Sequence, residues 1–302
     1  MEARERYQDW MDNPFIDDDT KNELRQLAHN EQEVEDRFFK WLEFGTGGLR
    51  GTIGAGSNRM NIYTVRLVTQ ALANNLKAQG KSAGGVAIAH DSRHLSREFT
   101  EAAAGVLVAN GIPVYVFPDV APTPLLSYAV RYHRASAGIV ITASHNPPQY
   151  NGYKVYNEHG NQMLTDAALN ISSQMTQLGL DSVQVDAHPK ENPLWHWLGE
   201  EVIQSYYECL LEIAPKVKNT ESLRVLYTPL HGTGGRFVPE ILRMAGFSAV
   251  STVKEQVAPD GRFPTVSFPN PEDPAAFKLA FTQAQWEPCD LIIATDPDAD
   301  RM

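Results

Sequence analysis

Cysteine, clustered basic residues and long apolar runs are all scarce in this chain of 302 residues. The two cysteines, Cys209 and Cys289, are far apart and have no metal-ligand spacing, so neither a disulfide scaffold nor a zinc site is indicated. No apolar run approaches the length of a membrane span and the N-terminus has no apolar signal core, which favours a soluble, cytoplasmic protein. A formal net charge of -11 without a basic stripe argues against binding to nucleic acid or to a membrane surface.

The composition is that of a globular protein, with 42% hydrophobic and 21% charged residues, and the length suffices for two domains. Residues 1–43 are predicted to form a charged, helical N-terminal extension. Thr20 and Glu23 have the spacing of a capping box, and apolar residues follow them at close to helical spacing.

Strands and helices alternate regularly from Gly85 onward, which predicts βαβ units with right-handed crossovers. We expect an α/β fold with two successive α/β/α sandwich domains and mixed sheets, over residues 44–190 and 191–302. The boundary is placed in a polar, proline-punctuated connector, and residues 153–163 are predicted to form a hairpin. The expected strands are Val86–Ala89, Val114–Phe117, one that ends at Thr142, Leu223–Thr228, Phe247–Val253 and Asp290–Thr295.

A serine and a histidine follow the buried strand in the stretch 138-GIVITASHNPPQYNGYKVY-156. Ligands gather at the carboxyl ends of strands in such sheets, so Ser144 is a candidate functional residue, although an ordinary turn is the alternative. Adjacent residues of an extended segment point to opposite faces, so His145 is expected to support Ser144 by hydrogen bonding more than to react directly. A serine hydrolase is disfavoured because the Gly-x-Ser-x-Gly elbow is missing.

Three carboxylates alternate in 296-DPDADR-301, directly after the last predicted strand. In an extended segment Asp296, Asp298 and Asp300 would share one face, and oxygen ligands of this kind suit Mg²⁺ or Ca²⁺. A solvated acidic turn is the alternative. An EF-hand loop is set aside because Arg301 stands where that loop requires glycine.

Glycine-rich segments and basic residues near these motifs suggest a phosphate site. Backbone N–H groups freed by glycine, together with arginine forks, suit a phosphate dianion, although each feature alone is weak. The features are 44-FGTGGLRG-51, 231-HGTGG-235, Arg50, Arg93, Lys154 and Arg301.

The sequence resembles the N-terminal half of an α-D-phosphohexomutase and is most similar to the bacterial α-phosphoglucomutase branch. The motifs 142-TASHNP-147, 151-NGYK-154 and 296-DPDADR-301 carry the resemblance, with the two glycine-rich segments in support. The resemblance implies that Ser144 carries the phosphoryl group and that one Mg²⁺ is held by a phosphoserine oxygen and the three aspartates. It also implies that Lys154 is an acid/base candidate. Arg50 and Arg301 would neutralise the phosphoryl group in transfer, and Arg93 is expected to contact phosphate.

The resemblance implies an intramolecular phosphotransferase that interconverts glucose 1-phosphate and glucose 6-phosphate through glucose 1,6-bisphosphate. A phosphomannomutase or phosphopentomutase is the alternative within the family, and a non-catalytic fragment that binds phosphosugar or metal is the alternative outside it. The motifs of the family's third and fourth domains are not in this sequence. We therefore expect the activity in a longer protein, with a small-molecule sugar phosphate as its partner, and little or none in this chain alone.

Overall fold

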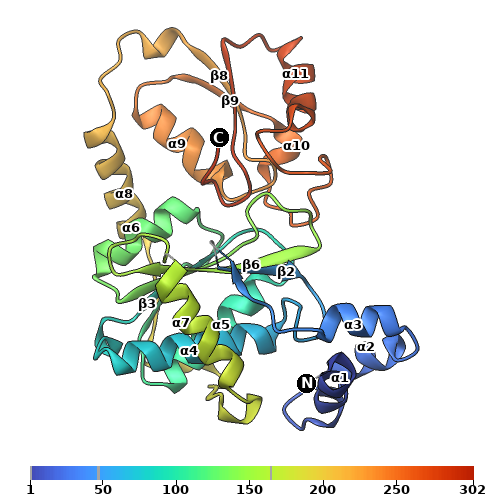
Figure 1. Ribbon diagram of the computed structural model, residues 1–302. Coiled ribbons are helices and arrows are strands. Elements are labelled where there is room, and N and C mark those ends of the chain that lie inside the picture. The colour runs from blue at the N-terminus through green and yellow to red at the C-terminus, as the bar shows by residue number, and fades with distance from the viewer. Residues whose placement is uncertain (1, 46–47, 164) are drawn as a thin grey trace.

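The computed structural model describes residues 2–45, 48–163 and 165–302. Figure 1 shows a group of N-terminal helices beside a first α/β domain, with a second α/β domain above it. The predicted fold class, two α/β/α domains behind a helical extension, is confirmed. Within the described ranges, no helix has the length and apolar character needed to cross a membrane.

The N-terminal extension contains three helices whose apolar faces form a small core of their own. The expected capping box at Thr20 is wrong, because Asp17 caps the second helix by accepting a hydrogen bond from the Thr20 backbone N–H. Glu23 instead pairs with Arg37 and accepts from the backbone N–H of Ala55, which ties the extension to the first domain. The three helices are α1 (Ala3–Asp12), α2 (Asp18–Leu27) and α3 (Glu31–Phe38).

The first domain contains a seven-stranded mixed sheet in the order β1-β2-β6-β5-β3-β4-β7. The strands β5, β3, β4 and β7 pair in parallel, whereas β1, β2, β6 and β5 pair in antiparallel fashion. Their bounds are β1 Phe44–Gly45, β2 Gly48–Thr52, β3 Val86–His90, β4 Val114–Val116, β5 Ala137–Ile141, β6 Tyr150–Asn157 and β7 Trp195–Trp197.

Helices cover both faces of this sheet. Val86 and Ile88 of β3 face one apolar cluster, and the alternate residues Ala87 and Ala89 face a second one. Both clusters are closed by helices, so β3 and β5 are buried along their whole length, as central strands of a parallel sheet usually are. The helices of this domain are α4 (Ile62–Ala78), α5 (Ser96–Ala109), α6 (Thr123–His133), α7 (Thr165–Gln177) and α8 (Glu200–Ile213).

Two expectations about the end of the first domain need correction. The hairpin expected within residues 153–163 is reduced to a single bridge between Tyr156 and Gln162, because β6 pairs instead with β5 and β2. The sheet also continues beyond the boundary expected at residue 190, since β7 pairs with β4 and buries Trp195. The buried Trp195 thus holds the chain against the first sheet after the polar connector.

The second domain contains three parallel strands in the order β10-β8-β9. The mixed pairing expected of both sheets is therefore found in the first sheet alone among the described residues. The elements are β8 (Arg224–Thr228), α9 (Gly234–Met244), β9 (Ala249–Thr252), α10 (Lys254–Val257), α11 (Lys278–Ala284) and β10 (Leu291–Ala294). The loops that follow β5 and β10 contact each other, so the carboxyl ends of these two strands lie near the boundary between the domains.

Candidate active site

Ser144 lies in the loop after β5, in a backbone conformation that L-residues rarely adopt. Its φ is 54°, in the left-handed region, so the segment turns sharply at this residue instead of remaining extended. The Thr142 hydroxyl accepts a hydrogen bond from the Ser144 backbone N–H at 2.8 Å and donates to Asp91 at 2.7 Å. The conformation of the serine is thus fixed from the neighbouring strand end of β3.

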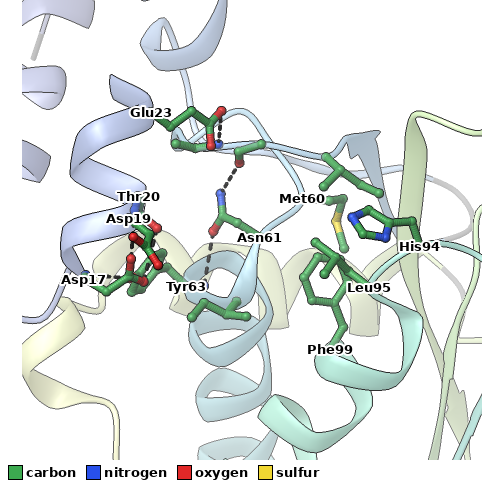
Figure 2. Close-up of a pocket in the computed structure, with 14 residues that line it drawn as sticks. Asp17, Asp19, Thr20, Glu23, Met60, Asn61, Tyr63, His94, Leu95 and Phe99 are labelled. Carbon is green, nitrogen blue, oxygen red and sulfur yellow. Dashed lines mark hydrogen bonds between the residues drawn. The ribbon is translucent and has the colours of Figure 1, made fainter. Parts of the chain in front are cut away.

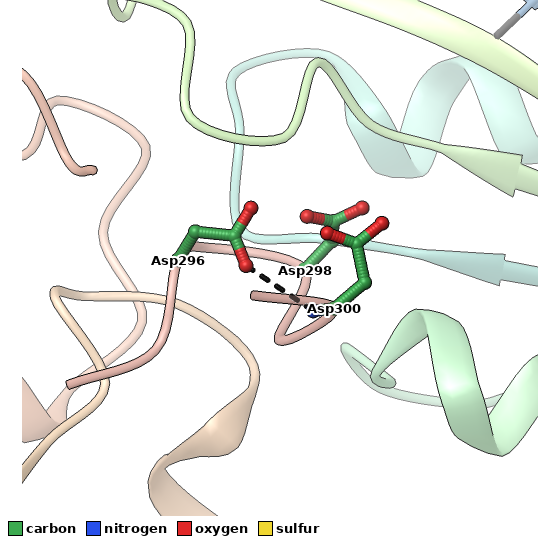
Figure 3. A group of neighbouring side chains, drawn as sticks. All are labelled: Asp296, Asp298 and Asp300. Carbon is green, nitrogen blue, oxygen red and sulfur yellow. Dashed lines mark hydrogen bonds between the residues drawn. The ribbon is translucent and has the colours of Figure 1, made fainter. Parts of the chain in front are cut away.

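The three aspartates after β10 converge because their loop turns tightly, and not because it is extended as expected. Asp296 accepts backbone hydrogen bonds from Asp300 and Arg301 on one carboxylate oxygen, and Ala299 has a φ of 53°. Figure 3 shows the three carboxylates and the bond between Asp296 and the Asp300 backbone. One oxygen from each of the three lies within 4.8 Å of the others.

The loop after β5 that carries Ser144 (the serine loop) meets the loop after β10 that carries the three aspartates (the aspartate loop) across the two domains. Ser144 Oγ donates to Asp296 Oδ2 at 2.6 Å. Lys154, on β6, donates to Asp298 Oδ2 at 2.7 Å and to Asp300 Oδ2 at 2.9 Å. Thr123 donates to the same Asp298 oxygen at 2.9 Å. Thr123 was not singled out from the sequence, although its Pro-Thr-Pro setting at the carboxyl end of β4 was visible.

Burial and mutual repulsion separate the acidities of the aspartates. Burial, together with the charge of Asp298, raises the pKa of Asp296 to about 8. Burial alone would also raise the pKa of Asp298, but the Lys154 ammonium holds it at about 2. Burial opposes the charge of Lys154, yet the two carboxylates keep its pKa above the usual value. Lys154 is therefore protonated in this arrangement.

The donor set fits a hard divalent cation. Three carboxylates converge, and Oδ1 of the fully buried Asp298 has no hydrogen-bond partner among the described residues. A buried carboxylate oxygen without a partner is costly, and a cation with oxygen ligands would satisfy it.

His145 lies within hydrogen-bond distance of Ser144, although the backbone at Ser144 is not extended as the sequence analysis assumed. Its Nδ1 is 3.2 Å from Ser144 Oγ, since the left-handed turn at Ser144 brings the two side chains to the same side. Burial, together with the nearby charges of Arg301 and Arg50, lowers the pKa of His145. The imidazole is therefore neutral near pH 7 and can accept or donate a proton through its tautomers.

The three arginines differ in their surroundings. Arg50 is exposed on β2 and donates to the Asn146 side chain at 3.0 Å. Arg301 is exposed and lies 3.6 Å from Glu272. Both remain accessible to an anion. Arg93 is instead buried, and its guanidinium donates to backbone carbonyls of the serine loop, so the expected phosphate contact of Arg93 is not supported.

The two glycine-rich segments have different outcomes. Thr46 and Gly47 lie outside the described residues, so the first segment is described only in part. In the second segment Gly232 lies against the backbone of Pro297, and the Thr233 N–H donates to the Pro297 carbonyl at 2.8 Å. A side chain at Gly232 would collide with that backbone. This segment therefore holds the aspartate loop in place.

A separate cavity of about 520 Å³ lies between the N-terminal extension and the first domain. Figure 2 shows Asp17, Asp19 and Thr20 on one side of it and Leu95 and Phe99 on the other. Several of its polar groups already have partners: Asp17 bonds Tyr63 and Thr20, and Glu23 pairs with Arg37 outside the lining. None of the candidate site residues lines it, so the geometry favours the contact between the two loops as the reactive site.

Comparison with protein families agrees with this geometry. The model described as phosphoglucomutase/phosphomannomutase, alpha/beta/alpha domain I, matches residues 42–181, and that of domain II matches residues 204–302. The chain belongs to the phosphoglucomutase/phosphomannomutase family. Both loops that meet at Ser144 and Asp296 lie inside the matched ranges, one in each domain.

Curated relatives in this family are named phosphoglucomutase. The protein of Staphylococcus epidermidis is 37% identical over 297 residues, which are 97% of this chain and 54% of the relative. That of Staphylococcus saprophyticus is 40% identical over 279 residues, 91% of this chain and 50% of the relative. The chain thus spans about half the length of the curated relatives it matches.

Solved structures show the same fold. A structure from Thermus thermophilus superposes with a TM-score of 0.72 at 28% identity, over 86% of this chain and 56% of that one. A phosphoglucomutase/phosphomannomutase family protein from Burkholderia thailandensis gives a TM-score of 0.68 at 22% identity, over 84% and 52%.

Proposed function

We propose that this chain contributes the phosphoserine and metal loops of an enzyme that interconverts glucose 1-phosphate and glucose 6-phosphate through glucose 1,6-bisphosphate. The observation that carries the proposal is the contact between Ser144 Oγ and Asp296 across the two domains. The contact brings a buried hydroxyl of the first domain against the carboxylate cluster of the second. The same placement suits a serine whose phosphoryl group must lie beside a metal ion.

Ser144 is the residue proposed to carry the phosphoryl group, and one Mg²⁺ would be held by Asp296, Asp298, Asp300 and an oxygen of the phosphoserine. A dianion on Ser144 would lie against three carboxylates, which is unfavourable without a compensating cation. When bound, Mg²⁺ supplies neutralisation of the charge that spreads over the phosphoryl oxygens.

We assign the proton transfers of the reaction to two residues, His145 and Lys154. When Ser144 takes a phosphoryl group, its hydroxyl proton must leave, and the neutral His145 at 3.2 Å is proposed to accept it once the hydroxyl has turned from Asp296 toward the imidazole. Lys154, which is protonated beside the aspartates, is the acid/base candidate on the sugar side. The exposed Arg50 and Arg301 are proposed to hold the phosphoryl group in transfer, since arginine forks match its oxygens.

The proposed reaction needs a grip on the phosphate that is not reacting, because the bisphosphate must turn over and bind again by its other end. Remote binding energy of this kind positions the reacting end and so raises turnover. The relatives continue for about as many residues again beyond the matched part. We therefore propose that this chain alone has no measurable mutase turnover. We also propose that the enzyme is cytoplasmic and that glucose phosphate is its substrate. Mannose and pentose phosphates are the alternatives.

A coupled assay tests the proposal on this chain and on a version extended to the length of the relatives. The extended version should convert glucose 1-phosphate faster than the mannose or pentose phosphates, with Mg²⁺ and the matching sugar bisphosphate present. Ser144→Ala should abolish turnover, while Ser136→Ala, at the opposite end of β5, serves as a control. Turnover by Ser144→Ala within about tenfold of the unchanged protein would rule out the phosphoserine route, since a covalent nucleophile cannot be removed at so small a cost.

A further inference from the structure

Arg93 occupies a place in the first domain that a phosphate ligand would not need. Its side chain and that of Asp91 are both fully buried, with Nε of Arg93 3.2 Å from Asp91 Oδ2. A buried ion pair is costly unless further hydrogen bonds satisfy its polar atoms. The pair lies at the end of β3, beside the loop that carries Ser144.

The guanidinium of Arg93 donates hydrogen bonds to four backbone carbonyl groups of the serine loop. Nη2 donates to the carbonyls of Ser144 at 2.7 Å and Asn146 at 2.5 Å. Nη1 donates to the carbonyls of Pro147 at 2.9 Å and Tyr150 at 3.0 Å. Four carbonyls that span seven residues of a turn therefore point at one planar cation. A lysine ammonium could not reproduce this fork.

Asp91 closes the same network from the other side. Its two oxygens accept hydrogen bonds from the Thr142 hydroxyl at 2.7 Å and from the Ser96 hydroxyl at 2.8 Å. Thr142 in turn accepts from the Ser144 N–H, so the peptide groups on both sides of the strained serine are held, its N–H through Asp91 and its carbonyl through Arg93. A non-glycine residue at a φ of 54° stays there only when its surroundings hold it.

The same turn touches the second domain. The Arg93 guanidinium lies over the Phe263 ring at 5.0 Å, and Ser92 donates to the His231 carbonyl at 2.8 Å. A Cβ at Gly261 would come within 2.7 Å of the Arg93 Cα, so only glycine permits this approach. His231 begins the segment that holds the aspartate loop through Pro297. The turn thus links the serine loop to the domain that carries the three aspartates.

We propose that Arg93, paired with Asp91, is a positioning residue that holds Ser144 in its strained conformation and aligns the serine loop with the aspartate loop. It acts through the loop carbonyls and through Phe263, and it does not touch the phosphoryl group. The kinetic part of this inference depends on the proposed function, whereas the structural part does not.

Hydrogen exchange on this chain tests the structural part without any activity. Arg93→Lys keeps the charge beside Asp91 but loses the fork, so exchange over residues 143–150 should accelerate at least about tenfold while α4 is unchanged. The matched control is Arg97→Lys, an exposed arginine four residues further on in the first turn of α5. Unchanged exchange of the loop in Arg93→Lys would overturn the proposal. If that variant loses protection everywhere, Thr142→Val decides, because it interrupts the link from Asp91 to the Ser144 N–H and should release the loop alone.

Kinetics of the extended version test the positioning role. Arg93→Lys should lower kcat by about 100-fold, the cost typical of a displaced reacting group, with KM and the half-saturating Mg²⁺ concentration changed less than about threefold. Full kcat in Arg93→Lys, or a loss confined to KM, would contradict positioning. If the unchanged extended version has no mutase activity, the proposed function fails, and the exchange experiment still decides the role of Arg93.

Discussion

Ser144 Oγ donates to Asp296 Oδ2 at 2.6 Å, although the two residues are 152 positions apart and belong to different domains. The contact joins the loop after β5 to the loop after β10, each at the carboxyl end of its strand. The relation between these two loops, and not either loop alone, supports phosphoryl transfer.

Asp300→Asn should weaken Mg²⁺ binding at least about tenfold, because one of three anionic ligands is lost. Asp300 is the exposed member of the cluster, so the free energy of unfolding should fall by about 1 kcal/mol or less. Calorimetric titration with Mg²⁺ and urea unfolding measure the two effects. Asp119→Asn, an exposed carboxylate outside the cluster, is the control. Equal Mg²⁺ affinities in the two variants would exclude Asp300 as a ligand.

Lys154→Met should tighten Mg²⁺ binding by about tenfold, because the ammonium no longer competes for the carboxylates of Asp298 and Asp300. Without metal, the variant should lose about 3 kcal/mol of stability, since a buried aspartate is left without its partner. Thermal unfolding with and without Mg²⁺ measures both changes. Lys81→Met, at the part-exposed pair with Glu158, should show neither. Weaker Mg²⁺ binding in Lys154→Met would mean that the lysine helps to build the metal site.

Mg²⁺ binding should strengthen as the pH rises toward about 8. Burial and the charge of Asp298 raise the pKa of Asp296 to about 8, so below that pH the carboxyl must release its proton before it can act as a ligand. Each pH unit below 8 should cost up to about tenfold in affinity. Titrations in two buffers of different ionisation enthalpy would reveal the released proton. An affinity that is constant from pH 6 to pH 8.5 would contradict the raised pKa.

Asp296 also makes the free energy of unfolding of the metal-free chain depend on pH. The pKa of Asp296 is higher in the folded state than its ordinary value of 3.8, so the folded state holds this proton more tightly. Its contribution to stability is present below about pH 4 and is lost as the pH rises through 8. Stabilisation by Mg²⁺ should therefore be larger at pH 8.5 than at pH 6, as thermal unfolding would show. The opposite order would be inconsistent with this assignment.

Tyr63→Phe should lower the free energy of unfolding by about 1–3 kcal/mol, the cost of leaving buried partners unsatisfied. The Tyr63 hydroxyl bonds the Asp17 carboxylate and accepts from the Asp17 N–H at 2.8 Å, which anchors the N-terminal extension. Urea unfolding measures the change, with Tyr132→Phe, an exposed tyrosine, as the control. Equal stability of the two variants would show that the extension is held by other contacts.

The sequence was sufficient for the alternating strands and helices from Val86 to Ile141 and from Arg224 to Ala294, because apolar runs and glycine-marked turns are local signals. It also led to Ser144 and the aspartates, because both groups follow the carboxyl ends of apolar strands, where ligands gather in sheets of this kind. The mechanism of convergence was not accessible in this way. The aspartates meet through a turn with a left-handed Ala299, and a period-two pattern carries no information about such a turn.

The errors have a common physical origin in contacts between distant residues. Arg93 was read as a phosphate ligand because its type suits phosphate, but its partners are loop carbonyls more than fifty positions away. The first domain was predicted to end at residue 190 because β7 joins its sheet by pairing with β4, and this pairing leaves no local pattern in the sequence.

Peptide mapping by mass spectrometry can locate the phosphoryl group proposed for Ser144. The extended version is incubated with glucose 1,6-bisphosphate and Mg²⁺, digested, and compared with its Ser144→Ala variant. We expect one added phosphate on the peptide that contains Ser144, which is removed by excess glucose 1-phosphate and is missing in the variant. Phosphate on another residue, with Ser144 unmodified, would rule out Ser144 as the carrier of the phosphoryl group.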